Sequence, residues 1–277
     1  MIQDIFPHRF NNHYLAGKAL GNEDYVLHYH GDSLLLKISG EALDIPRKYD
    51  FPEITDKAER MFLFTLDETP CFLITDELKE RKPQLVFKEI SFFRTALRRE
   101  IAWVSIAGHQ LANWYLQHRY CGACGAKTQH KPDERALICP ECQTIVYPKI
   151  CPAIIVAIIC KNKILLARNS NFPGSWYSLI AGYADVGESL EETVKREVKE
   201  EVGLDVRNIR YYKSQPWPLS SSMMIGFVAK ADESQPISMD DHEISEAAWF
   251  SRENLPAHPA SISIAGEMIE KFKLGEL

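Results

Sequence analysis

The chain has 277 residues, of which 45% are hydrophobic and 25% charged, and its formal net charge is -6. This length favours more than one domain, because one hydrophobic core usually serves about 100 to 200 residues. The acidic balance gives no support to broad, sequence-independent binding of nucleic acid, which needs a basic surface.

The sequence also shows no membrane segment. Its N-terminus lacks a basic region followed by an apolar run, and the longest apolar stretch, Ala153–Cys160, is too short to span a bilayer. We therefore expect a cytoplasmic protein without a membrane partner. Its seven cysteines would then be thiols or metal ligands rather than disulfides.

Residues 1–117 are predicted to form a strand-rich domain that ends in a helix. Two hairpins are expected, the first from Tyr25–His30 and Ser33–Ile38, and the second from Met61–Leu66 and Cys71–Thr75. Apolar residues then recur at helical spacing from Arg94 to Gln117, and a charged turn is expected before them, at Lys79–Pro83.

Residues 118–148 carry two Cys-x-x-Cys pairs, Cys121 with Cys124 and Cys139 with Cys142. Two such pairs separated by a short loop can place four thiolates around one Zn²⁺ ion. Because four protein ligands leave no position for water, this zinc is expected to be structural, with one ion per chain. The alternative is a set of unrelated thiols or a redox pair.

Residues 149–277 are predicted to form a mixed α/β domain. A hairpin of Ala153–Cys160 and Lys163–Arg168 opens it, and Trp176–Ala181 forms the strand that leads to a helix. The later elements are two strands and a closing helix, at Val206–Tyr212, Met223–Lys230 and Ile262–Phe272. This order predicts an α/β/α sandwich around a mixed sheet.

The helix after Gly182 has clear start and stop signals. Ser189 and Glu192 form a capping box, and Gly203 ends the helix because glycine adopts the left-handed conformation without steric cost. At 100° per residue, Leu190, Val194 and Val198 form the inward stripe.

Glu197 and Glu201 fall on that inward stripe, with Glu200 on its flank, whereas Lys195, Arg196 and Lys199 are expected on the solvated side. Ionised carboxylates that face inward are costly and repel one another unless a cation meets them. Mg²⁺ or Mn²⁺ suits such oxygen ligands. The alternative is a solvated acidic face of the helix. It is disfavoured because Glu197 and Glu201 fall on the same stripe as the apolar residues.

The segment after this domain's first helix contains Trp217 between two prolines, followed by hydroxyl side chains. The prolines restrict the backbone to an extended form, so the indole can bind a flat base at little entropic cost. Packing of Trp217 as a structural anchor is the alternative.

These residues resemble the Nudix hydrolases. The match covers Gly182, Glu188, Arg196, Glu197, Val198, Glu200, Glu201, Gly203 and Leu204. The four cysteines and the segment from Ser214 to Pro218 are similar to the zinc-ribbon-containing NADH pyrophosphatase branch of that family. Leu219 and Ser220 depart from the pattern, since the branch has Phe-Pro there.

The resemblance implies roles for further residues. Metal ligation (Mg²⁺ or Mn²⁺) is implied for Glu197, Glu200, Glu201, Glu243 and the carbonyl of Ala181. Glu188 and Arg196 are implied as a supporting ion pair, and Glu201 or a neighbouring glutamate as the base. Substrate contacts are implied for Glu134, Tyr147, Tyr183, Gln215, Pro216, Trp217, Pro218, Leu219, Ser220, Ser221, Ser222 and Ala265. A homodimer is also implied.

The function expected from this resemblance is metal-dependent hydrolysis of the pyrophosphate in NADH or NAD-type dinucleotides, giving AMP and a nicotinamide mononucleotide. One alternative is removal of NAD caps from RNA 5′ ends by the same chemistry. A catalytically inactive nucleotide-sensing regulator is another. Such a protein would be expected to lose acidic residues of the Nudix motif between Gly182 and Leu204, and none of them is missing here.

Overall fold

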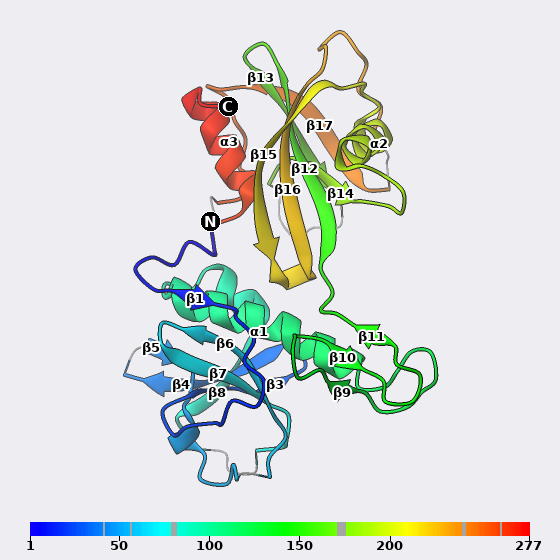
Figure 1. The fold of residues 1–277 in the computed structure, drawn as a ribbon. Helices are drawn as coiled ribbons and strands as arrows, with labels where there is room; N and C mark the ends of the chain where they lie inside the picture. The colour runs from blue at the N-terminus through cyan, green and yellow to red at the C-terminus, as the bar shows by residue number, and fades with distance from the viewer. Residues whose placement is uncertain (41, 56, 79–81, 171–175, 240–241, 261) are drawn as a thin grey trace. The chain divides into compact units, whose positions relative to one another are not determined.

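The computed structural model describes the chain except residues 41, 56, 79–81, 171–175, 240–241 and 261. It separates into two compact units (Figure 1). The C-terminal unit comprises Met1, Ile150–Trp217 and Ser221–Leu277, and the N-terminal unit comprises Ile2–Lys149 and Pro218–Ser220. Among the described residues, no helix is both long enough and apolar enough to cross a membrane.

The C-terminal unit is built on one mixed six-stranded sheet, as predicted. Its order is β15-β16-β12-β13-β17, with β14 paired to β12. Among the described strands of this sheet, only the β12/β16 pair is parallel. The strands are β12 (Cys151–Cys160), β13 (Lys163–Asn169), β14 (Ile180–Tyr183), β15 (Arg207–Trp217), β16 (Ser222–Lys230) and β17 (Ile244–Ser251).

Alternating side chains of β12 build a core on each face of this sheet. Ile154 and Val156 pack with Val194 and Val198 of α2 (Leu190–Val202). The residues between them pack with α3 (Ile264–Leu274) on the other face, where Ile155 and Ala157 meet Met268 and Ile269. Figure 1 shows α2 and α3 on opposite sides of the sheet. The predicted α/β/α sandwich is therefore confirmed.

Three details of this unit differ from the prediction. β14 begins at Ile180 rather than Trp176, and β17 was not predicted. β15 is longer than expected and continues through Pro216 to Trp217, so the extended backbone predicted there is sheet. Proline is tolerated because β15 is an edge strand.

The described residues of the N-terminal unit form three sheets, two of them in the strand-rich region. One has the order β1-β6-β7-β2, and in the other β4 pairs with β3, β5 and β8. The strands are β1 (Phe10–Asn11), β2 (Tyr25–Leu27), β3 (Tyr29–His30), β4 (Ser33–Ser39), β5 (Ala42–Asp44), β6 (Arg60–Leu66), β7 (Thr69–Ile74) and β8 (Leu85–Glu89).

Both predicted hairpins of this unit are present, since β3 pairs with β4 and β6 pairs with β7. The strand expected at Tyr25–His30 is split, however, because its first half joins β7 in the other sheet. Most of the turn predicted at Lys79–Pro83, residues 79–81, lies outside the described part of the chain.

The long helix of the N-terminal unit is α1 (Arg99–Gln117), which begins later than the predicted Arg94 because Ile90–Arg94 forms a 3₁₀ turn. The segment that carries the four cysteines, residues 118–148, is called the zinc-binding segment below. It adds a small sheet in the order β11-β10-β9. Its strands are β9 (Gln129–His130), β10 (Leu137–Ile138) and β11 (Ile145–Val146).

Candidate active site and zinc ribbon

The ends of α2 are fixed as the sequence predicts. The Ser189 hydroxyl accepts a hydrogen bond from the Glu192 N–H at 3.3 Å, and the Glu192 carboxylate accepts one from the Ser189 N–H at 2.8 Å. Gly203 terminates the helix with φ of +73°. This capping sets the rotation of the helix and therefore the direction of its glutamates.

The glutamates of α2 differ in burial as their positions around the helix predict. Glu201 is buried, the Glu197 side chain is only 12% exposed, and Glu200 on the flank is 57% exposed. Burial raises the pKa of Glu197, Arg196 partly offsets this effect, and the charges of Glu200 and Glu243 raise the pKa further. Glu243, which directly precedes β17, therefore lies within electrostatic reach of the cluster.

Arg196 corrects one expectation, because it is not on a solvated face. Its side chain is 30% exposed and its guanidinium joins three carboxylates. Nε lies 2.5 Å from Glu188, and Nη1 donates to Glu197 at 2.8 Å and to Glu200 at 2.9 Å. Nη2 donates to the Tyr183 carbonyl at 2.9 Å. Arg196 thus holds the loop before α2 against the helix.

Glu188 is held by several donors besides Arg196. The Asp185 N–H donates to it at 3.1 Å and the Thr193 hydroxyl at 2.9 Å. These hydrogen bonds, led by the one from Arg196, lower the pKa of Glu188 to about 2. Glu188 therefore remains ionised and orients Arg196, rather than exchanging protons near neutral pH.

Gly182 allows β14 to approach Glu197 directly. A Cβ added at Gly182 would lie 1.9 Å from the Glu197 carboxyl carbon and about as close to both of its oxygens. Any other residue type would therefore force the Glu197 carboxylate to move. Ala181, next to Gly182, pairs with Ile155 in the sheet, so its backbone is fixed beside the same carboxylate.

This arrangement fits a divalent cation. Carboxylates from one helix turn gather beside a peptide backbone, and one arginine cannot neutralise all of them. Hard oxygen donors of this kind are the ligands that Mg²⁺ and Mn²⁺ prefer.

Several predicted substrate residues have structural partners in the C-terminal unit. Gln215 is fully buried; its side chain donates to the Ile262 carbonyl at 3.0 Å and accepts from the Ile264 N–H at 2.6 Å. It therefore fixes the start of α3. Ala265 is buried in the core between α3 and the sheet.

Tyr183 and the end of β15 are more open. Tyr183 is 53% exposed and its hydroxyl lies 3.1 Å from the hydroxyl of Ser222, which is buried. Pro216 and Trp217 are partly buried, and Ser221 has a φ of +56° in the turn before β16.

The remaining predicted substrate residues belong to the N-terminal unit. The Tyr147 hydroxyl donates to Glu134 at 3.1 Å, and Lys131 lies 2.9 Å from the same carboxylate. Pro218, Leu219 and Ser220 form a 3₁₀ turn.

The four cysteines cluster as their spacing predicts. All four sulfurs lie within 4.8 Å of one another, with Cys121 and Cys142 at 3.5 Å and Cys124 and Cys139 at 3.4 Å. Tetrahedral Zn²⁺ with bonds of about 2.3 Å needs sulfurs roughly 3.8 Å apart. Hydrogen bonds led by that of the Thr144 hydroxyl lower the pKa of Cys142 to about 6, which favours a thiolate there. At Cys124 the hydrogen bond from the Ala126 N–H is outweighed by those with the Cys139 and Cys142 thiols, and the pKa is raised to about 12.

Three family models match consecutive parts of the chain. Residues 149–272 match a NUDIX domain, residues 116–147 an NADH pyrophosphatase zinc ribbon domain, and residues 23–114 an NADH pyrophosphatase-like rudimentary NUDIX domain. The chain is also 40% identical over 209 residues, 75% of each protein, to the NAD-capped RNA hydrolase NudC of Pseudomonas fluorescens.

The chain belongs to the Nudix hydrolase family. It is similar to a second NudC, that of Stutzerimonas stutzeri, with 42% identity over 59% of each protein. Among solved structures, it resembles a NUDIX hydrolase from Nitrosomonas europaea with 23% identity and a TM-score of 0.48, covering 56% of this chain and 90% of the other.

The match of the N-terminal region to a rudimentary NUDIX domain was missed by sequence reasoning. That region was assigned only as strand-rich, because it has no counterpart of the run from Glu188 to Glu201. Its strands were visible in the sequence, but their pairing into two sheets was not.

Proposed function

We propose that this Nudix hydrolase cleaves the pyrophosphate bond of NADH and NAD-type dinucleotides to AMP and a nicotinamide mononucleotide. The carboxylate cluster of α2 carries this proposal, since it is packed against Gly182 and organised by Arg196. The adjoining NADH pyrophosphatase zinc ribbon supports the substrate class.

In this proposal Glu197, Glu200, Glu201 and the Ala181 carbonyl hold Mg²⁺ or Mn²⁺, with Glu243 completing the set. When bound, these cations neutralise the pyrophosphate charge and acidify a water molecule. Glu201 or a neighbouring glutamate accepts the proton from that water. Arg196 positions the glutamates, and Glu188 positions Arg196.

Substrate recognition is proposed for Tyr183, Ser222 and the segment from Gln215 to Ser221, with Trp217 stacking on a base. Glu134, Tyr147 and Ala265 are assigned to the same role. We also propose a cytoplasmic homodimer whose chains divide into domains 1–117, 118–148 and 149–277, with zinc stabilising the middle one.

The test is to incubate purified protein with Mg²⁺ or Mn²⁺ and a panel of dinucleotides in ¹⁸O-labelled water, followed by mass spectrometry. We expect NADH to give AMP and reduced nicotinamide mononucleotide, one of them carrying the label. Absence of hydrolysis for every dinucleotide would overturn the proposal.

A second candidate is removal of NAD caps from RNA, because relatives at 40% and 42% identity are named NAD-capped RNA hydrolases. The same bond is cleaved, but the leaving group is a polynucleotide. Comparing kcat/KM for NADH with that for NAD-capped RNA distinguishes the two. A higher value for capped RNA assigns that substrate to this chain.

A further inference from the structure

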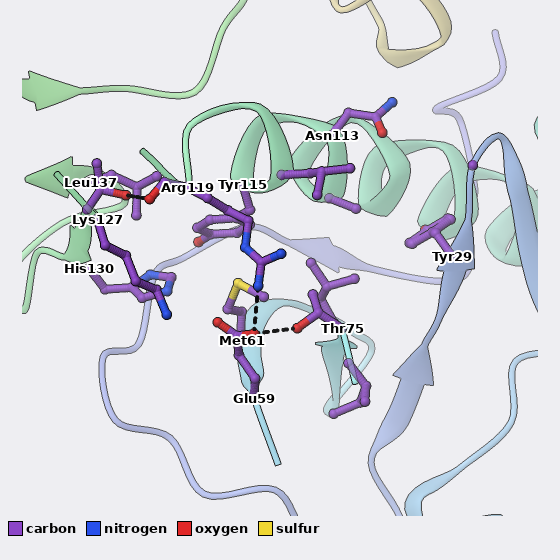
Figure 2. Close-up of a pocket in the computed structure, with 16 residues that line it drawn as sticks. Tyr29, Glu59, Met61, Thr75, Asn113, Tyr115, Arg119, Lys127, His130 and Leu137 are labelled. Carbon is purple, nitrogen blue, oxygen red and sulfur yellow. Dashed lines mark hydrogen bonds and ion pairs between the residues drawn. The ribbon is translucent and has the colours of Figure 1, made fainter. Parts of the chain in front are cut away.

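The N-terminal unit contains a pocket of about 200 Å³ that has no part in the chemistry described above. Four separate parts of the chain line it: Tyr29 and Gly31 at β3, the β6 and β7 strands with the residues beside them, α1 with Arg119 after it, and the zinc-binding segment (Figure 2). All of them belong to one compact unit. The pocket therefore exists only when the zinc-binding segment is packed onto the strand-rich domain.

The walls of the pocket are apolar and aromatic. Met61, Leu73 and Leu137 are buried, and Tyr115 is buried beside the His130 ring at a centroid distance of 5.1 Å. Such walls suit a flat, ring-shaped ligand. At about 200 Å³ the space is smaller than most drug-sized sites, so the ligand is no larger than a single nucleotide unit.

The charged groups of the pocket favour an anion. Arg119 and Lys127 bring two positive charges and Glu59 one negative charge. His130 adds little charge near pH 7, because desolvation lowers its pKa and Glu59 only partly offsets this effect. Within the described part of the chain, the Lys127 ammonium has no hydrogen-bond or ion-pair partner. It is therefore available to a ligand phosphate.

Arg119 is held only weakly. Its Nη2 lies 3.4 Å from Glu59, and both side chains are nearly half exposed, so this pair contributes little and is easily exchanged. Glu59 keeps a second partner, since the Thr75 hydroxyl donates to it at 3.1 Å. Figure 2 shows both of these contacts meeting at Glu59. A ligand can thus recruit Arg119 while Glu59 stays in place as an acceptor.

We propose that this pocket binds a mononucleotide whose base carries an amino group, with the phosphate at Lys127 and Arg119 and the amino edge of the base facing Glu59. An aromatic carboxylate would satisfy the cations but would leave Glu59 against an apolar ring edge, which is unfavourable. A free phosphate would leave the apolar walls unused. The proposal does not depend on the proposed hydrolase activity.

The test uses the full-length zinc-loaded protein without added divalent metal, titrated by calorimetry with GMP, UMP and inorganic phosphate. GMP should bind more tightly than UMP, because guanine offers two adjacent N–H donors to a carboxylate, and both should bind more tightly than phosphate. Lys127→Ala and Arg119→Ala should each weaken GMP binding about tenfold or more. Lys18→Ala removes an exposed lysine outside the pocket and is the matched control.

Photolabelling with 8-azido-GMP locates the site independently of affinity. We expect label on peptides containing Tyr115 or His130, competed by GMP. Leu116→Trp should block labelling by filling the pocket mouth, since Leu116 is 63% exposed and can be enlarged without disturbing the core. Label confined to the C-terminal unit, or equal affinity for GMP and phosphate, would overturn the proposal. Glu201→Gln should label normally, so failure here is distinguishable from failure of the proposed activity.

Discussion

The helices α1 and α2 show how differently two regions of one Nudix protein use a helix. α2 has five glutamates in 13 residues and a narrow apolar stripe, whereas α1 has one acidic residue in 19 and is buried over much of its surface. Most of α1 lies in the rudimentary NUDIX match and α2 in the NUDIX match. Buried carboxylates are costly unless they are paired, and the single one in α1 has its own arginine whereas several in α2 share one, so only α2 has the excess of negative charge that a cation would neutralise.

The largest expected effect tests this contrast with one glutamate from each helix. Glu201→Gln should lower kcat for NADH at least about 100-fold, because it removes a proposed metal ligand and base. Glu100→Gln is the matched change in α1, where the equally buried Glu100 pairs with Arg98 at 2.8 Å. It should cost about 1 to 3 kcal/mol of stability, because a buried charge-assisted hydrogen bond is weakened, and should leave kcat intact.

Steady-state kinetics and thermal melts of the two variants decide this comparison. Near-normal turnover by a folded Glu201→Gln protein would contradict the assignment of the active carboxylates. A matching loss in Glu100→Gln would show that α1 also contributes to catalysis.

The next effect concerns zinc, which we expect to stabilise the N-terminal unit only. Cys121→Ser should release zinc and lower the stability of that unit by several kcal/mol, because metal binding contributes directly to folding. Hydrogen exchange read by mass spectrometry should show faster exchange across α1 and β9 to β11, with the C-terminal sheet unchanged. Cys151→Ser, a partly exposed cysteine outside the cluster, is the control. Full stability of the zinc-free protein would contradict a structural role.

Two glycines provide a third test. Gly182 lies against a proposed metal ligand, Glu197, whereas Gly108 lies against side chains that only pack in the N-terminal unit. Gly182→Ala would force Glu197 to move and should lower kcat more than tenfold with a small change in stability. Gly108→Ala in α1 places a Cβ 2.5 Å from the Tyr29 hydroxyl and 2.8 Å from Leu27. It should cost about 1 to 3 kcal/mol and leave kcat intact.

Kinetics and urea denaturation of both glycine variants separate the two outcomes. If Gly182→Ala retained full activity, Glu197 would have no fixed role beside β14. If Gly108→Ala changed kcat, packing of α1 would be coupled to the active site.

The sequence predicted those features whose cause is local. The ends of α2 follow from Ser189, Glu192 and Gly203, and the zinc ligands follow from spacing alone. The sequence does not show which residues of β12 face α2 and which face α3. A strand buried on both sides is apolar at nearly every position, so it has no alternating pattern to read.

Features that depend on distant segments do not follow from local pattern. Helical phase alone places Arg196 toward solvent, and only the family resemblance implied its ion pair with Glu188, because Glu188 lies in the loop before the helix and Tyr183 in β14. The resemblance assigns Gln215 to substrate contact, which stays a prediction, and no local pattern indicates that its buried side chain also bonds to residues 47 and 49 positions away. Such contacts arise only when the sheet and helices have assembled.

The smallest expected effect is a difference in acid sensitivity between the units. In the N-terminal unit, burial lowers the pKa of His109 below its usual value, and Asp32, 3.2 Å away, only partly offsets this. The folded state then binds fewer protons than the unfolded state, so stability falls as pH drops below about 6.5 and levels off below the folded pKa. Glu188 in the C-terminal unit behaves differently: its pKa of about 2 preserves its contribution until the pH falls below about 4.5.

Urea denaturation at pH 7.5, 6.5 and 5.5, with hydrogen exchange to resolve the units, measures this difference. We expect the N-terminal unit to lose stability over this range and His109→Gln to show a shallower slope than the wild type. Because both proteins keep the four cysteines, any acid release of zinc affects them equally and cancels in the comparison. Identical slopes would show that His109 is protonated in the folded protein as readily as in the unfolded chain, which would require water or Asp32 to compensate its burial fully.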